Sequence, residues 1–183
     1  MTSSSSAIDP KVRTRLSDGS LAGTWRLDGA RSTVGLRSKS LWGLAPVKGQ
    51  FAQISGEGVI SPAGEVTGSI RVASASIDTK NKKRDAHLRS AEFFNSDVYP
   101  DITFAVDHVD VTAEGASAVG TLEVAGRKRP LEVPVSVTAS AEDTLELDAA
   151  INVDRSDFGL TWNQVGMVSM RNTITIHTLF TRN

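Results

Sequence analysis

Apolar and polar residues alternate along most of this chain, as in strands that turn one face to a core and the other to solvent. The clearest run covers residues 145–153, where Leu, Ala, Ile and Val alternate with Glu, Asp and Asn. Similar runs, bounded by turn residues, cover residues 24–28, 32–40, 102–106, 131–137 and 172–180. We therefore predict about eight strands, mostly consecutive and joined by short turns.

Two segments carry signs of a bend or bulge. Residues 47–61 contain three glycines, at positions 49, 56 and 58, within a strand pattern. Along residues 66–78 the apolar phase moves from Ile70 and Val72 to Ala75 and Ile77. Interior glycines and phase shifts are typical of strands that curve strongly.

One segment changes period from two to about three and a half. If residues 85–94 are helical, Leu88, Ala91 and Phe94 share one face, and Asp85 pairs with Arg89 four residues on. We predict one short helix inserted into a β chain. Its apolar stripe requires it to lie on the mouth or flank of the sheet.

Strands with one apolar face must hide that face and their sheet edges, and rolling into an antiparallel barrel does both. An all-β barrel is therefore the predicted fold, with a sandwich as the alternative. The candidates for its inward face have small or medium side chains, which leave room for one apolar ligand. They are Val34, Leu36, Ile70, Val72, Leu122, Val135, Ala149 and Ile174.

The 183 residues fit a single domain. The chain has 20 basic and 21 acidic residues, and this near balance of charge argues against nucleic acid as the main partner. The absence of cysteine excludes disulfides and thiolate metal sites.

The first part of the chain has a different composition. Residues 1–22 are Ser-rich at their start and show no sustained period, so we expect a mobile tail with at most a helical turn near residues 12–16. The ordered domain is expected over residues 23–183. The start lacks the features of a secretory signal, and no later run is apolar enough to span a membrane, so the expected location is the cytoplasm.

Several motifs, in order, resemble the YceI-like family. The most distinctive is the run Arg-Asp-Ala-His-Leu-Arg-Ser at 84–90, followed by Phe-Phe at 93–94 and Tyr-Pro-Asp-Ile-Thr-Phe at 99–104. Gly-Thr-Trp-Arg-Leu-Asp at 23–28, Val-Lys-Gly-Gln-Phe at 47–51 and Arg-Ser-Asp-Phe-Gly-Leu at 155–160 also fit.

The resemblance implies an extended eight-stranded antiparallel barrel of lipocalin type with one helical insertion. It also implies non-enzymatic binding, storage or transport of an amphipathic isoprenoid lipid, of the polyprenyl diphosphate or quinone type. Many members of the family are periplasmic, and they suggest a homodimer. No cofactor is implied.

The candidate ligand-binding residues combine the inward positions with the insertion and the later aromatic loop. Arg84 and His87 are expected at the cavity mouth, near a polar head group. Trp42, Phe158 and Trp162 are expected either as a wall around an apolar chain or as a core plug. The full set is Val34, Leu36, Trp42, Phe51, Ile70, Val72, Arg84, His87, Leu88, Phe94, Phe104, Phe158, Leu160 and Trp162.

The polar residues allow two other roles, catalysis and membrane contact, and argue against a metal site. Arg84, Asp85 and His87 are the candidates for an enzyme acting on such a lipid, but Asp85 and His87 point to different sides of a helix, so capping and pairing is favoured. The basic run at 80–89 is either a solvated loop or a peripheral contact with an anionic membrane. The three histidines, at 87, 108 and 177, lack metal-ligand spacing.

Overall fold

The computed structural model describes residues 6–163 and 166–183, and within them it is almost entirely antiparallel sheet. The helices are α1 (Pro10–Ser17) and α2 (Lys82–Arg89), with 3-10 turns η1 (Gly29–Arg31), η2 (Ser74–Ser76) and η3 (Arg155–Phe158). The strands are β1 (Gly23–Leu27), β2 (Thr33–Ser40), β3 (Ala45–Phe51), β4 (Ile54–Ile60), β5 (Val66–Ala73), β6 (Ile77–Asp78), β7 (Asp101–Val111), β8 (Ala116–Val124), β9 (Arg127–Ala141), β10 (Thr144–Asp154) and β11 (Arg171–Arg182).

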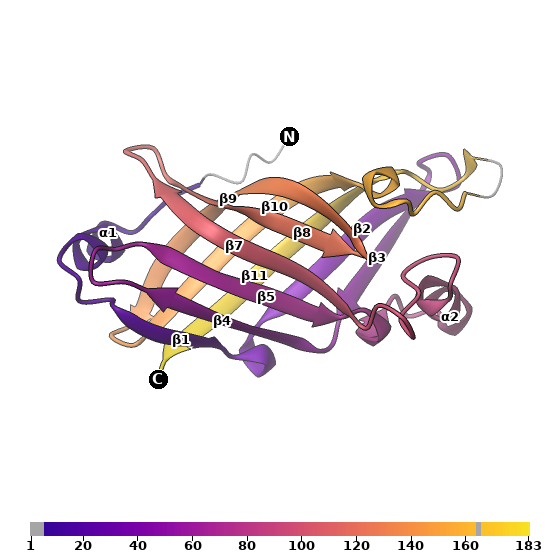
Figure 1. Ribbon diagram of the computed structural model, residues 1–183. Coiled ribbons are helices and arrows are strands. Elements are labelled where there is room, and N and C mark those ends of the chain that lie inside the picture. The colour runs from indigo at the N-terminus through magenta and orange to yellow at the C-terminus, as the bar shows by residue number, and fades with distance from the viewer. Residues whose placement is uncertain (1–5, 164–165) are drawn as a thin grey trace.

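Eight of these strands close into a barrel, in the order β1-β4-β5-β7-β8-β9-β10-β11 (Figure 1). β1 completes the ring by pairing with β11, with Trp25 opposite Arg182 and Leu27 opposite Phe180. The predicted antiparallel barrel is confirmed, and the sandwich alternative is wrong. Closure removes the sheet edges that an open sandwich would leave unpaired.

The wall is lengthened by β2, β3 and β6. The first half of β11 pairs with β2, from Thr173 opposite Arg37 to His177 opposite Thr33, and the second half pairs with β1. β3 pairs with β2 and, at its end, with β6. β11 is therefore paired along one half with β2 and along the other half with β1, and this arrangement lengthens the barrel.

The two segments with signs of a bend are each divided between two strands. Residues 47–61 form the end of β3 and the whole of β4. The predicted strand over residues 66–78 is broken by η2 into β5 and β6. β7 carries a register shift between Val106 and His108, which brings the interior side chains back into phase at Val109. Gly120 lies opposite this bulge, where an added Cβ would collide with the carbonyl oxygen of Ala105.

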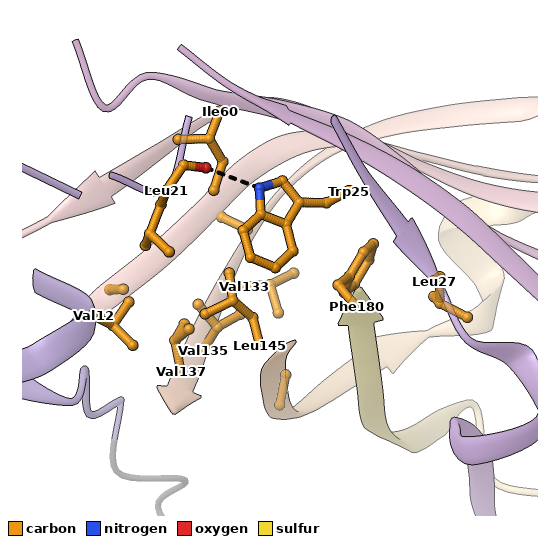
Figure 2. Close-up of a cluster of buried hydrophobic side chains, with 13 residues drawn as sticks. Val12, Leu21, Trp25, Leu27, Ile60, Val133, Val135, Val137, Leu145 and Phe180 are labelled. Atoms are coloured by element: carbon orange, nitrogen blue, oxygen red, sulfur yellow. Dashed lines mark hydrogen bonds between the residues drawn. The ribbon is translucent and has the colours of Figure 1, made fainter. Parts of the chain in front are cut away.

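Helix α1 lies at one end of the barrel and α2 at the other (Figure 1). Asp9 caps α1 by accepting a hydrogen bond from the Lys11 amide, and Ile8 forms a bridge with Val137 of β9. Val12 is 3% exposed and Leu21 is fully buried. Figure 2 shows both side chains packed beside Trp25.

This packing corrects the expectation of a mobile tail up to residue 22. Residues 6–22 are tied to the barrel end, and residues 1–5 lie outside the described part of the chain. The apolar residues of this segment are too few and too spaced to show a period, yet they bury well because the barrel end is apolar. Among the described residues, no helix is long and apolar enough to cross a membrane.

The predicted helical insertion is confirmed as α2, but the helix ends at Arg89, so Ala91 and Phe94 lie in the turn beyond it and not on its face. The predicted internal ion pair is wrong. Asp85 accepts hydrogen bonds from the amide and hydroxyl of Thr79, and Arg89 donates to the carbonyl oxygens of Ala75 and Ile77. Both side chains bind the segment before the helix instead of one another. The insertion is thus fastened to the continuation of β5.

Candidate functional site

The barrel interior holds two apolar cavities of about 150 Å³ each. We call the one beside α1 the α1 chamber and the one beside α2 the α2 chamber. Four side chains line both chambers: Ile70, Phe104, Val133 and Ile176. The chambers therefore meet at one ring of residues in the middle of the barrel.

The α1 chamber is closed by the segment around α1. Val12, Leu16 and Leu21 form its end, together with Trp25. Figure 2 shows Val12, Leu21 and Trp25 in the same buried cluster. The hydroxyl of Thr178, which also lines this chamber, is buried and has no hydrogen-bond partner. Most of the other lining residues are Val, Ile, Leu, Ala and Phe, and the two acidic ones, Glu57 and Asp148, are exposed to solvent, so this chamber suits a hydrocarbon.

The α2 chamber is closed by two segments that are far apart in the sequence. The turn after α2 contributes Phe93 and Phe94, whose rings meet edge to face at 5.0 Å. The loop after β10 contributes Phe158 and Leu160. Phe94 also lies 6.2 Å from Phe51 of β3, so aromatic rings surround this end of the cavity.

Arg155 is the only charged side chain that lines the α2 chamber within the described residues, and it is 4% exposed. Its guanidinium donates to the carbonyl oxygens of Leu160, Trp162 and Ser169. Its Nη2 atom has no hydrogen-bond partner among the described residues, and its Cζ atom lies 5.5 Å from the ring centre of Phe93. The site therefore contains a buried cation with one free donor nitrogen.

Burial lowers the pKa of the Arg155 guanidinium below its usual value, and the charge of Asp154 acts in the opposite direction. No carboxylate forms a salt bridge with Arg155 in the described part of the chain. A buried cation without a paired anion is costly in an apolar interior. A ligand that places an acceptor oxygen near Nη2 would reduce this cost.

His87 lies next to this cluster without lining the chamber. Its ring centre is 4.3 Å from that of Trp162 and 6.4 Å from that of Phe93. Nδ1 lies 3.4 Å from a Glu92 carboxylate oxygen, while Nε2 is buried and has no hydrogen-bond partner. His87 thus supports the aromatic rings that close the chamber.

Arg84 and Asp85 form no catalytic cluster with His87. Arg84 donates to the hydroxyl and carbonyl oxygens of Thr79 over 2.7 and 2.8 Å, and Asp85 accepts from the same residue. These contacts hold the start of α2 in place. No group of three potential metal-ligating side chains is found within residues 6–163 and 166–183.

The structure brings together most of the predicted ligand-binding residues. Nine of them line the α2 chamber: Val34, Leu36, Phe51, Ile70, Val72, Phe94, Phe104, Phe158 and Leu160. All eight residues predicted to face inward from their strands line one of the two chambers.

The other five lie outside both chambers. Leu88 packs against the core from the insertion, and Arg84 and His87 have the contacts described above. Trp162 is 37% exposed and Trp42 is 69% exposed. The expectation that Trp42 walls the cavity is wrong, because the turn between β2 and β3 carries it beyond the barrel.

The sequence reasoning missed the residues that close the chambers. Phe93 and Arg155 belong to motifs that were recognised, but nothing in the sequence indicated that they meet. Val12, Leu16 and Leu21 were assigned to a tail. Ile8, Val12 and Leu16 are spaced four apart, but three residues cover too few turns to establish a helical period.

Comparison with known proteins gives a consistent picture. Residues 25–180 match the model of the YceI-like domain. The chain is 30% identical over 145 residues to the UPF0312 protein SAS2572 of Staphylococcus aureus, covering 75% of this chain and 82% of the relative.

Two solved structures share the fold. One is Burkholderia cenocepacia BcnA, with a TM-score of 0.75, 24% identity and coverage of 84% of this chain and 98% of that one. The other is a polyisoprenoid binding domain from Saccharophagus degradans, implicated in plant cell wall breakdown. It has a TM-score of 0.71, 18% identity and coverage of 87% of this chain and 98% of that one.

Proposed function

Because the chain belongs to the YceI-like family, we propose that it binds one amphipathic isoprenoid lipid in the barrel interior and acts as a carrier or store. The observation that carries the proposal is the pair of apolar chambers that meet at Ile70, Phe104, Val133 and Ile176. The polyisoprenoid binding domain named above shares this barrel and supports the choice of ligand.

The polarity of the two chambers supports one orientation of the ligand. The α1 chamber is lined mainly by apolar side chains, and its two acidic lining residues, Glu57 and Asp148, are exposed to solvent, which suits the end of a hydrocarbon chain. The α2 chamber contains the guanidinium of Arg155, which suits a polar head. We therefore place the head near Arg155 and the chain toward Trp25.

The apolar contacts are sufficient for useful affinity. Each buried methylene contributes about 0.8 kcal/mol, so ten buried carbons contribute roughly 8 kcal/mol before ordering costs, the scale of a micromolar complex. Long strands provide the length for such a chain, since 12 residues of β11 extend roughly 40 Å at about 3.3 Å per residue.

The donors near the head position favour a head with a single acceptor oxygen, such as a quinone carbonyl. Arg155 supplies one free nitrogen, and its other nitrogens are already bound to backbone oxygens. A diphosphate carries several anionic oxygens and would need more donors than this end of the chamber provides. We place the polyprenyl diphosphate second for this reason.

The contacts of the insertion support a binding role over catalysis. A catalytic acid or base must reach the reacting group. Arg84 and Asp85 instead bind Thr79, and the buried nitrogen of His87 lies among aromatic rings. The enzyme alternative through these three residues predicts turnover on isoprenoid substrates that Ala substitution of His87 abolishes.

The first experiment is native mass spectrometry of the protein purified from its own host. A co-purifying lipid of defined mass is the expected result. Binding of a panel with one isoprenoid chain and different heads then identifies the head: quinone, alcohol, diphosphate and the bare hydrocarbon. Absence of any bound lipid, together with no binding across the panel, would overturn the proposal.

A substitution tests the position of the head. Arg155→Met removes the donor and should reduce the preference for the quinone over the hydrocarbon, while hydrocarbon affinity is retained. Arg71→Met, on the outer face with 52% side-chain exposure, is the matched control and should leave both affinities unchanged. An unaltered quinone preference in Arg155→Met would place the head elsewhere.

A further inference from the structure

The hairpin between β2 and β3 exposes large apolar side chains at its tip. Leu41 is 45% exposed, Trp42 69% and Leu44 85%, and Gly43 lies between them. Hairpin turns are usually polar, with Asn, Asp or Gly at positions of positive φ. These side chains contribute little buried surface to the fold.

The backbone of the tip is strained as well. Leu41 and Trp42 adopt positive φ values of 52° and 54°, a region that non-glycine residues rarely enter. The Trp42 amide donates to the carbonyl oxygen of Met167 over 3.3 Å, which ties the tip to the loop after β10. Strain maintained by neighbouring structure is typical of functional sites.

Unpaired cations lie on the outer face of the same hairpin. Arg37 and Lys48 are directly opposite one another, and Lys39 is two residues closer to the tip. None of these three side chains forms a salt bridge in the described part of the chain. Like charges in opposite positions are unfavourable, so this arrangement points to an external anion.

The apolar and basic features belong to the strands that wall the α2 chamber. Val34 and Leu36 of β2 and Phe51 of β3 face the chamber, and the tip continues beyond them. In Figure 1 the hairpin extends past the barrel at the end that also carries α2 and the loop after β10. The tip is therefore at the end of the barrel where we place the lipid head.

We propose that this hairpin docks the protein on an anionic membrane surface, with Leu41, Trp42 and Leu44 in the interface and Arg37, Lys39 and Lys48 over the lipid phosphates. Tryptophan and leucine beside basic residues suit the interfacial region of a bilayer. The inference rests on the proposed function, because a long isoprenoid has to be exchanged with a membrane. It adds the surface through which exchange takes place.

Flotation with vesicles free of isoprenoid lipid tests the docking surface by itself. The wild-type protein should bind phosphatidylcholine vesicles that contain phosphatidylglycerol, and bind them more weakly at high salt or without the anionic lipid. The double variant Trp42→Ser and Leu44→Ser should bind about tenfold more weakly or worse. Lys39→Glu with Lys48→Glu should show a loss of about the same size, through charge.

Matched controls lie at the other end of the barrel. Val59→Ser removes an exposed apolar side chain of β4, and Lys11→Glu reverses an exposed charge of α1. Both should bind vesicles as the wild type does. Ligand affinity measured in detergent should be unchanged in every hairpin variant, since these side chains line neither chamber.

Three results would overturn the docking proposal. One is that the hairpin variants bind vesicles as strongly as the wild-type protein does. The second is loss of binding on charge reversal at Lys82 and Lys83 alone, which would move the contact to α2. The third is self-association, seen by analytical ultracentrifugation and removed by Trp42→Ser and Leu44→Ser, without vesicle binding. A failure of isoprenoid binding would leave the vesicle result unchanged, so the two proposals are tested separately.

Discussion

The indole Nε1 of Trp25 donates a hydrogen bond to the carbonyl oxygen of Leu21 over 3.0 Å, and both residues are almost completely buried (Figure 2). This bond ties the segment after α1 to the first strand of the barrel. It closes the α1 chamber with a polar interaction that is hidden from water.

Trp25→Phe should lower the free energy of unfolding by about 1–3 kcal/mol, because the smaller phenyl ring leaves a cavity and the buried Leu21 carbonyl loses its donor. Urea denaturation measures the change. Trp162→Phe is the matched control, since Trp162 is 37% exposed. Equal stability of the two variants would contradict the role given to the buried bond.

Gly120→Ala should be strongly destabilising, by about 2–4 kcal/mol, because the new methyl group has no space beside the β7 bulge. Gly58→Ala is the control within another strand. There the nearest atom to an added Cβ is the Thr67 carbonyl oxygen at 3.5 Å, an ordinary contact. Thermal unfolding should separate the two variants clearly, and similar melting temperatures would show that the bulge tolerates a side chain.

Asp85→Ala should loosen the insertion that closes the α2 chamber. The buried amide of Thr79 would lose its acceptor, at a cost of about 1–3 kcal/mol. Hydrogen exchange should become faster across residues 80–100 while the strands at the α1 end stay protected. Asp97→Ala alters an exposed carboxylate of the same insertion and should leave exchange unchanged. If exchange across residues 80–100 were no faster in Asp85→Ala than in Asp97→Ala, the contacts of Asp85 would not be what holds the insertion in place.

Ala118→Phe should shorten the ligand that the barrel accepts, because residue 118 faces the α1 chamber. Affinity for a long isoprenoid should fall about tenfold or more, while a short isoprenoid with the same head binds as before. Ala105→Phe, exposed on the outer face of β7, serves as the control. A parallel loss for short and long chains would indicate that the chain does not extend from Arg155 toward α1.

The strands and their inner faces were predictable because they follow from local geometry. Val34, Leu36, Ile70, Val72 and Leu122 were expected to face inward, and all of them line a chamber. Side chains alternate across a strand, so a short stretch of sequence is enough to assign its faces. Closure into a barrel follows from the need to pair every edge.

The helical insertion was predictable in position but not in its contacts. The change of period located α2, whereas Asp85 and Arg89 bind backbone and side-chain groups of residues 75–79 and not one another. A helix surface allows the i,i+4 pair, but that pair is weak in water. The donors of Thr79 compete for Asp85, the carbonyl oxygens of Ala75 and Ile77 compete for Arg89, and these contacts prevail.

By itself, the sequence determined the strand pattern, the apolar inner faces, the insertion and the family, because these depend on residue types a few positions apart. Only the tertiary structure decided how the barrel ends are closed. The backbone of Val137 in β9 accepts a hydrogen bond from the Asp9 amide and donates one to the Ala7 carbonyl oxygen, and Arg155 lies over Phe93 at the opposite end. Such contacts join residues that are far apart in the chain, so no local sequence pattern predicts them. They form only once the closed barrel presents an apolar rim.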